Sequence, residues 1–173
     1  DGVFMVLLCT MMIPWAVTMI PSYIIWAKLG LTNTFVPLVL PSIGGSAYYT
    51  FMFKQNMRGI PNEITEAAEI DGASQFQILV SIVMPLIKTT IGAIALLSFI
   101  SYWNDYTTAM IYLPSRPTIA YGLYYFTHSS TNESSYVTVG IAACMLVTIP
   151  IFLVFLLFKN KLVTPDPQFL AAK

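Results

Sequence analysis

Long apolar blocks, separated by short charged stretches, are the main feature of the chain. No charged residue stands between Asp1 and Lys28, or between Lys28 and Lys54. A helix of ~20 apolar residues crosses a bilayer core of ~30 Å. Because the blocks lack the apolar–polar alternation of a soluble helix or strand, the pattern predicts membrane-spanning helices at about residues 3–27, 33–54, 86–110 and 136–158.

These segments predict one domain over residues 1–173, an all-α polytopic transmembrane helical bundle. Pro14 and Pro21 lie inside the first segment and should bend it, since proline removes a backbone donor, and neighbouring helices satisfy the freed carbonyls. A polar loop, residues 55–85, joins the second and third spans. A second loop, residues 111–135, joins the third and fourth spans on the opposite side.

The basic residues are distributed unevenly between the two sides. If all four segments cross the bilayer, only Lys28 and Arg116 lie on the side of loop 111–135. Positively charged loops favour the cytoplasmic face. The sequence therefore predicts that loop 55–85 and the C-terminus are cytoplasmic, because that side carries the other six basic residues: Lys54, Arg58, Lys88, Lys159, Lys161 and Lys173.

Composition excludes several functional classes. Hydrophobic residues make up 57% of the chain and charged residues 9%, against a usual charged share of about 25%. The net charge is zero, which leaves no basic stripe to bind nucleic acid. There is no phosphate-binding G-x-x-x-x-G-K-[ST] motif, no metal-ligand cluster and no Ser-His-Asp set. We therefore expect no enzyme activity and no cofactor on this chain.

Loop 55–85 predicts two short helices joined by a turn. Asn62 is a suitable N-cap for the first helix, and Gly72 tolerates the left-handed backbone conformation that ends it. Ser74 and Gln77 fit a capping box for the second helix, and Pro85 introduces the third span. Such an element is too polar for the bilayer and too apolar to remain free in water. It should dock on a partner or pack on its own spans.

The loop resembles the EAA loop of ABC importer permeases. It contains Glu66-Ala67-Ala68, then Gly72, Ile82 and Met84-Pro85, at the family's spacing. Met84 is the single departure, since the family has leucine there, and this is a mild change. Two other segments resemble the carbohydrate (maltose-type) branch of these binding-protein-dependent inner-membrane components: residues 28–34 and 99–105.

The resemblance implies a coupling role for this loop. In the family, its helices sit in a cleft of the ATPase subunit and move when that subunit closes on ATP. ATP and Mg are thus expected on the partner ATPase, and none on this chain. Carried over to this sequence, the coupling residues are Glu66, Ala67, Ala68, Asp71, Gly72, Phe76, Ile82 and Pro85.

The same resemblance implies an assembly in the bacterial inner membrane. The expected partners are a pair of ABC ATPase subunits, a second permease subunit, an extracellular solute-binding protein and membrane lipid. Permeases of the branch have six spans, and the four predicted here match the last four, so two more are expected upstream. The tail, residues 163–173, departs from the glycine-containing ending of the branch.

A candidate substrate path lies at the end of the third span. Tyr102, Trp103, Asn104 and Asp105 combine flat rings with polar groups, a mixture that suits the C–H faces and hydroxyl groups of sugars. For Trp103 the alternative is an interfacial anchor. For Asp105 the alternative is a position at the outer mouth, where placing a charge costs less than the ~2.5–3.5 kcal/mol that it costs at the middle of the bilayer.

Other transport classes remain open at this point. A permease for another small solute fits the same features, because only the branch resemblance points to sugars. A secondary transporter or channel is a different class, and such proteins usually carry ionisable groups or unwound helices at the midplane. The charged candidates here lie at span ends, which disfavours that class.

Overall fold

The computed structural model describes residues 2–129 and 134–163, and every regular element in these ranges is helical. The tail beyond Val163, Lys173 included, lies outside the described residues. The elements are α1 (Gly2–Met11), α2 (Trp15–Lys28), α3 (Val36–Ile43), α4 (Ala47–Met57), α5 (Asn62–Ile70), α6 (Gln75–Ile78), the π-helical turn η1 (Leu79–Val83), α7 (Met84–Leu86), α8 (Lys88–Trp103), α9 (Thr107–Tyr112), α10 (Ile119–Ser129) and α11 (Ser134–Val163).

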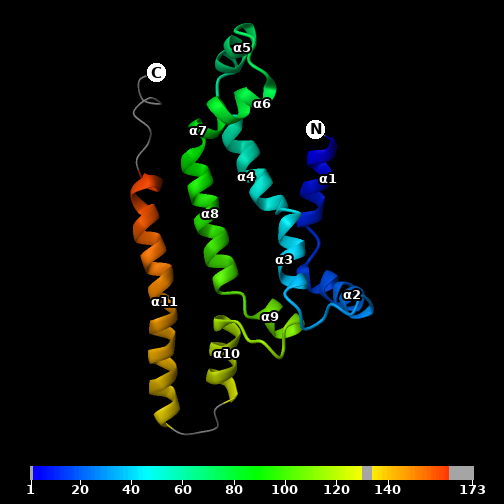
Figure 1. Ribbon diagram of the computed structural model, residues 1–173, viewed down its shortest axis with the longest axis vertical. Helices are drawn as coiled ribbons and strands as arrows, with labels where there is room; N and C mark the ends of the chain where they lie inside the picture. Colours follow the sequence, from blue (N-terminus) through cyan, green and yellow to red (C-terminus); the bar gives the residue numbers. More distant parts are fainter. Residues whose placement is uncertain (1, 130–133, 164–173) are drawn as a thin grey trace.

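The helices form an elongated open bundle (Figure 1). The two longest, α8 and α11, pack side by side, while α4 packs on both α1 and α8. Helices α5 and α6 project from one end, and α9 and α10 lie toward the other. Polar contacts fix neighbouring helices: the Thr90 hydroxyl donates to Asn56 Oδ1 at 2.7 Å between α8 and α4. Lys54 Nζ of α4 lies 3.7 Å from the ring centre of Phe4 in α1, a cation–π contact.

One stretch of the described chain, Val137–Lys159 within α11, is long and apolar enough to cross a membrane as a single helix. Two helix pairs meet the same criteria only when each pair is counted as one bent span. They are α1 with α2, bent by 93°, and Gln75–Leu86 with α8, bent by 75°. The predicted fourth span, residues 136–158, falls inside α11. That all four segments cross a bilayer stays a prediction.

The predicted first span is bent where proline interrupts it. Helix α1 ends before Pro14, because a residue before proline avoids the helical conformation and the proline nitrogen has no hydrogen to donate. Pro14 itself has an extended backbone and precedes α2.

The predicted spans 33–54 and 86–110 are not continuous helices either. Gly45, with a φ of +75°, separates α3 from α4. Asn104, Asp105 and Tyr106 separate α8 from α9.

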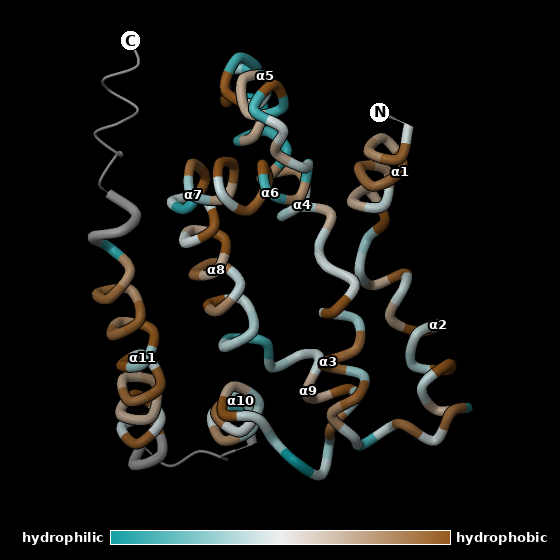
Figure 2. Tube along the Cα trace, turned by 45° about the horizontal axis from the view of Figure 1, so that its top comes forward, coloured by the Kyte–Doolittle hydropathy of each residue, from teal (hydrophilic) through white to brown (hydrophobic). Residues whose placement is uncertain are grey.

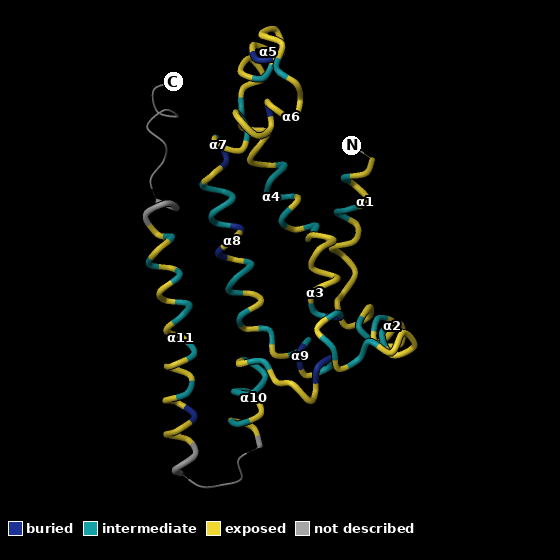
Figure 3. The backbone as a smooth tube through the Cα atoms, viewed as in Figure 1, coloured by how far each residue is buried: buried dark blue, intermediate teal, exposed yellow. Residues whose placement is uncertain are grey.

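The described chain buries few side chains (Figure 3). Leu113 is completely buried and Ala109 nearly so, but large apolar side chains along α1, α2 and α11 are exposed. Figure 2 shows that α11 is apolar over most of its length, whereas polar residues concentrate in α5. Apolar faces of this extent require lipid or other protein chains to cover them.

Candidate functional site

Gly72 makes the turn between α5 and α6. Its φ of +83° is left-handed, a conformation that glycine adopts without a steric penalty. The amide of Gly72 donates to the Glu69 carbonyl at 3.0 Å, and that of Ala73 to the Ala68 carbonyl at 3.0 Å. These two bonds form a Schellman motif, which satisfies the last carbonyls of α5. The predicted helix end at Gly72 is confirmed.

The start of α6 is also fixed by side chains. Ser74 Oγ accepts from the Gln77 amide, and Gln77 Oε1 accepts from the Ser74 amide at 2.8 Å, which confirms the predicted capping box. The Gln75 side-chain amide donates to the Glu69 carboxylate, so that α6 is tied to α5.

The prediction that Asn62 is the N-cap of the first loop helix is wrong. Pro61 occupies the N-cap position of α5, because its fixed φ suits entry into a helix.

Pro85 explains the π-helical turn that follows α6. A proline has no amide hydrogen, so it cannot bond to the carbonyl four residues earlier, and the ladder shifts. In η1 the Met84 amide bonds to the Leu79 carbonyl five residues back. The chain then bends by 75° into α8. This bend lies at Ile87, between α7 and α8, and it sets the direction in which residues 55–85, named the coupling loop for their predicted role, leave the bundle.

Most of the predicted coupling residues lie on the surface of this loop (Figure 3). Ala68 is the buried residue of α5 and Ile82 is half-buried, so these two side chains face the interior of the loop. Ile70, at 86% exposed, lies beside the predicted set and was missed, although an isoleucine in the last turn of a polar helix is a visible signal. The exposed predicted residues are Glu66, Ala67, Asp71, Gly72, Phe76 and Pro85.

The coupling loop projects from the end of the bundle that carries most basic residues. This end contains the last turn of α4 with Lys54, the start of α8 with Lys88, and the C-terminal end of α11 with Lys159 (Figure 1). Arg116 lies in the connection between α9 and α10, at the other end. The grouping of basic residues expected from the sequence is therefore present in the fold.

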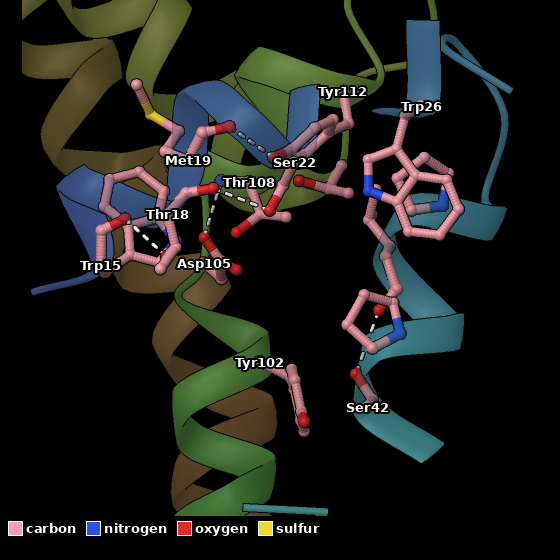
Figure 4. A pocket seen from close by; sticks show the side chains of 14 residues that line it. Trp15, Thr18, Met19, Ser22, Trp26, Ser42, Tyr102, Asp105, Thr108 and Tyr112 are labelled. Atoms are coloured by element: carbon pink, nitrogen blue, oxygen red, sulfur yellow. Dashed lines mark hydrogen bonds between the residues drawn. The ribbon is translucent and has the colours of Figure 1, made fainter. Parts of the chain in front are cut away.

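A cavity of about 520 Å³ lies away from the coupling loop, where α2 crosses α3 and the junction of α8 with α9 (Figure 4). This volume falls within the range of small-molecule sites, about 300–1,000 Å³. Its lining mixes aromatic rings, hydroxyl groups and one carboxylate: Trp15, Thr18, Met19, Ser22, Trp26, Pro37, Leu38, Pro41, Ser42, Tyr102, Asp105, Thr108, Tyr112 and Thr118.

The structure divides the four predicted substrate-path residues into two pairs. Tyr102 and Asp105 line the cavity. The Trp103 indole instead donates to the Val147 carbonyl of α11 at 3.2 Å. The Asn104 side-chain amide donates to the Ile100 carbonyl of its own helix at 2.9 Å. The cavity therefore contains one residue pair of the predicted path, and the other pair holds helices in place.

The α2 side of this cavity was missed by sequence analysis. Trp15, Thr18, Ser22 and Trp26 recur at intervals of three or four residues, a spacing that places them on one helix face. Two hydroxyls between two indoles, in an otherwise apolar segment, are the signal that identifies this face. The Tyr112 phenol lies across from it and donates to the Met19 carbonyl at 3.4 Å. Burial raises the pKa of Tyr112 above its usual value.

Asp105 is the only carboxylate among the described lining residues. Its Oδ1 accepts from the Thr108 amide at 3.0 Å, at the start of α9. This leaves the Oδ2 oxygen as an acceptor for a ligand. No lysine, arginine or histidine lines the cavity within the described part of the chain. The cavity thus combines one carboxylate with hydroxyl, phenol and indole groups, and its described lining carries no positive charge.

The described chain is a helical bundle with exposed apolar faces and an exposed helix–turn–helix loop, which defines an α-helical membrane protein, and comparison with known proteins gives the family. Residues 1–164 match the family described as binding-protein-dependent transport system inner membrane component. The chain belongs to this family, which confirms the resemblance seen in the loop. The family's proteins are transport permeases, not enzymes.

Curated relatives include the lactose transport system permease protein LacG of Rhizobium radiobacter, 34% identical over 94% of this chain and 59% of the relative. The arabinooligosaccharides transport system permease protein AraQ of Halalkalibacterium halodurans is 28% identical over 91% of this chain and 56% of its own length. The sn-glycerol-3-phosphate transport system permease protein UgpE of Agrobacterium fabrum is 39% identical over 61% of this chain and 37% of its own. The chain thus spans less than two thirds of these relatives.

Proposed function

We propose that this chain forms part of the transmembrane subunit of an ATP-driven importer for sugars or oligosaccharides. The observation that carries the proposal is the exposed α5–Gly72–α6 turn, where Ile70 is 86% and Phe76 73% exposed and the Glu66 carboxylate is exposed as well. Apolar anchors within a charged rim are typical of a protein-docking surface. In this proposal the surface docks on a separate ATPase subunit, which holds ATP and Mg.

The coupling mechanism follows from the rigidity of the turn. The Schellman motif, the capping box and the Glu69–Gln75 bond fix α5 against α6. A push on the exposed face then moves both helices as one body. This motion passes through η1 and Pro85 into α8, which packs on α11 and α4. ATP-driven closure of the ATPase pair thereby changes the arrangement of the bundle.

The remaining partners follow from the family description and the exposed apolar faces. A second permease subunit and lipid cover α1, α2 and α11, and a binding protein delivers the solute from outside the cell. The coupling loop and C-terminus face the cytoplasm of a bacterial cell, because most basic residues lie at that end. Sugar as the cargo is supported by relatives named for lactose and arabinooligosaccharides.

The test is uptake of radiolabelled lactose or arabinotriose by right-side-out membrane vesicles that contain the natural transporter and its binding protein. We predict uptake that requires ATP inside the vesicle, stops with vanadate and persists when an uncoupler collapses the proton gradient. Vesicles from a strain without the transporter are the control. Uptake that resists vanadate and disappears with the gradient would instead indicate a secondary transporter and contradict the proposal.

A further inference from the structure

We propose that the cavity between α2, α3 and the α8–α9 junction is a binding site for a neutral, polyhydroxylated solute, and that it excludes anionic solutes. This inference rests on the proposed function and names the solute chemistry that the permease itself accepts. It uses the lining on both sides: Trp15, Ser22 and Trp26 from α2, and Tyr102 and Asp105 from the end of α8 (Figure 4).

Three hydroxyl groups of the lining are oriented by their own helices. Thr18 Oγ1 donates to the Trp15 carbonyl at 2.9 Å, Ser22 Oγ to the Thr18 carbonyl at 2.7 Å, and Ser42 Oγ to the Leu38 carbonyl at 3.0 Å. The protons of these three hydroxyls are therefore engaged, and their oxygens keep lone pairs for a ligand. Asp105 Oδ2 adds a charged acceptor at the opposite wall. A ligand with donors matches these acceptors, and its own acceptors can receive from the Trp15 and Trp26 indoles and the Tyr102 phenol.

Sugars provide such donors together with apolar faces. Every sugar hydroxyl can donate one hydrogen bond while it accepts others, and the C–H faces of the ring pack against aromatic rings. Trp15, Trp26 and Tyr102 place three such rings around the cavity. Amphipathic rings of this kind bind ligands that are apolar on one face and polar at the edge. A lipid chain is a poor alternative, because it would leave the Asp105 carboxylate facing an apolar medium.

Charge separates neutral sugars from phosphorylated solutes. A phosphate group carries only acceptors at its oxygens, and proteins bind it with arginine, lysine or backbone amides. Within the described residues the cavity offers no basic side chain and one carboxylate, so a phosphate would meet the repulsion of Asp105 with no positive charge to offset it. The cavity therefore fits the named cargo of the lactose and arabinooligosaccharide relatives and not that of the sn-glycerol-3-phosphate relative.

Protection of a cysteine at position 22 tests the proposal directly. The natural transporter complex, without binding protein, is placed in nanodiscs with Ser22→Cys and with its other cysteines, Cys9 and Cys144 included, replaced by alanine. A small maleimide labels the thiol in the presence of lactose, arabinotriose or sn-glycerol-3-phosphate. We predict that a sugar at about twice its Kd slows labelling about threefold. The phosphate compound should leave the rate unchanged.

Two further variants make the result specific. Ser115→Cys, exposed in the connection between α9 and α10 and outside the cavity lining, should be labelled at the same rate with and without sugar. Asp105→Asn keeps an oxygen for the Thr108 amide but removes the charge. It should raise the sugar concentration for half-protection about fivefold, the difference between a charged and a neutral hydrogen bond.

Equal protection by sugar and sn-glycerol-3-phosphate would overturn the proposal. Absence of sugar protection would overturn it too, and the uptake assay identifies what has failed. If vanadate-sensitive sugar uptake persists in the Ser22→Cys complex, the importer function stands and the cavity is not the binding site. If the natural transporter takes up no sugar with ATP, the proposed function itself fails, and the cavity proposal fails with it.

Discussion

Gly72 fixes the angle between the two helices of the coupling loop. Its left-handed φ of +83° is closed to most side chains on backbone grounds, although a methyl group on its Cα would meet no other atom within 4 Å. Strain would therefore come from the backbone alone. A left-handed conformation costs about 1–2 kcal/mol for an ordinary residue, and asparagine tolerates it better.

We predict that Gly72→Val disrupts the turn and lowers recovery of the ATPase subunit with the purified permease. Gly72→Asn is the matched control and should retain most of the recovery, because asparagine enters the left-handed region more readily. Both variants should reach the membrane in equal amounts, as measured by immunoblot. Equal recovery from the two variants would show that the backbone conformation at Gly72 is not required for docking.

Predictability from sequence differed from residue to residue. Gly72 and the Ser74–Gln77 box were predictable, because caps depend on local backbone chemistry. Asn62 was not, because Pro61 competes for the same role and takes the N-cap position. Trp103 and Tyr102 are neighbours in sequence but face α11 and the cavity respectively. Only the packing of α8 determines which way each side chain points.

At the scale of elements, the ends of helices were harder to predict than the apolar blocks. Hydropathy located the block that became α11, but it gave no break between α3 and α4 or between α8 and α9. Those breaks depend on Gly45 and on the Asp105–Thr108 bond. The α2 face of the cavity was missed because its polar residues are too few to change the average hydropathy of the segment.

The contact between α8 and α11 yields a prediction for Trp103. Trp103→Phe removes the indole donor to the Val147 carbonyl but keeps a ring beside Phe99, whose centroid lies 5.5 Å away. Loss of one such bond costs about 1 kcal/mol, so the melting temperature of the purified complex should fall by a few degrees. The sugar concentration for half-maximal protection of Ser22→Cys should stay unchanged.

Trp26→Phe is the comparison variant, because Trp26 lines the cavity. It should weaken sugar protection with little change in melting temperature. If Trp103→Phe weakens protection as strongly as Trp26→Phe, then Trp103 belongs to the sugar site, and its assignment to helix packing is wrong.

The whole molecule separates its two proposed functional sites in space. The coupling loop projects from the end rich in basic residues, and the cavity lies toward the end that carries α9 and α10 (Figure 1). Helix α8 connects them, since it begins just after Pro85 and ends beside Asp105. In the proposed importer, this helix transmits movement of the ATPase to the solute site. Opening of the solute site at one end of the bundle is thereby linked to ATP binding by the ATPase at the other end.

The most direct test of this account is co-purification of the ATPase subunit with the natural permease, comparing Phe76→Ala with Phe35→Ala. Both phenylalanines are exposed, at 73% and 54%, but Phe35 lies at the start of α3, away from the loop. We predict that Phe76→Ala weakens ATPase binding about tenfold, the effect of losing ~1.4 kcal/mol at a docking anchor. Glu66→Lys should weaken it further, and Phe35→Ala should match the wild type. Equal ATPase recovery from all four proteins would contradict the assignment of the coupling loop.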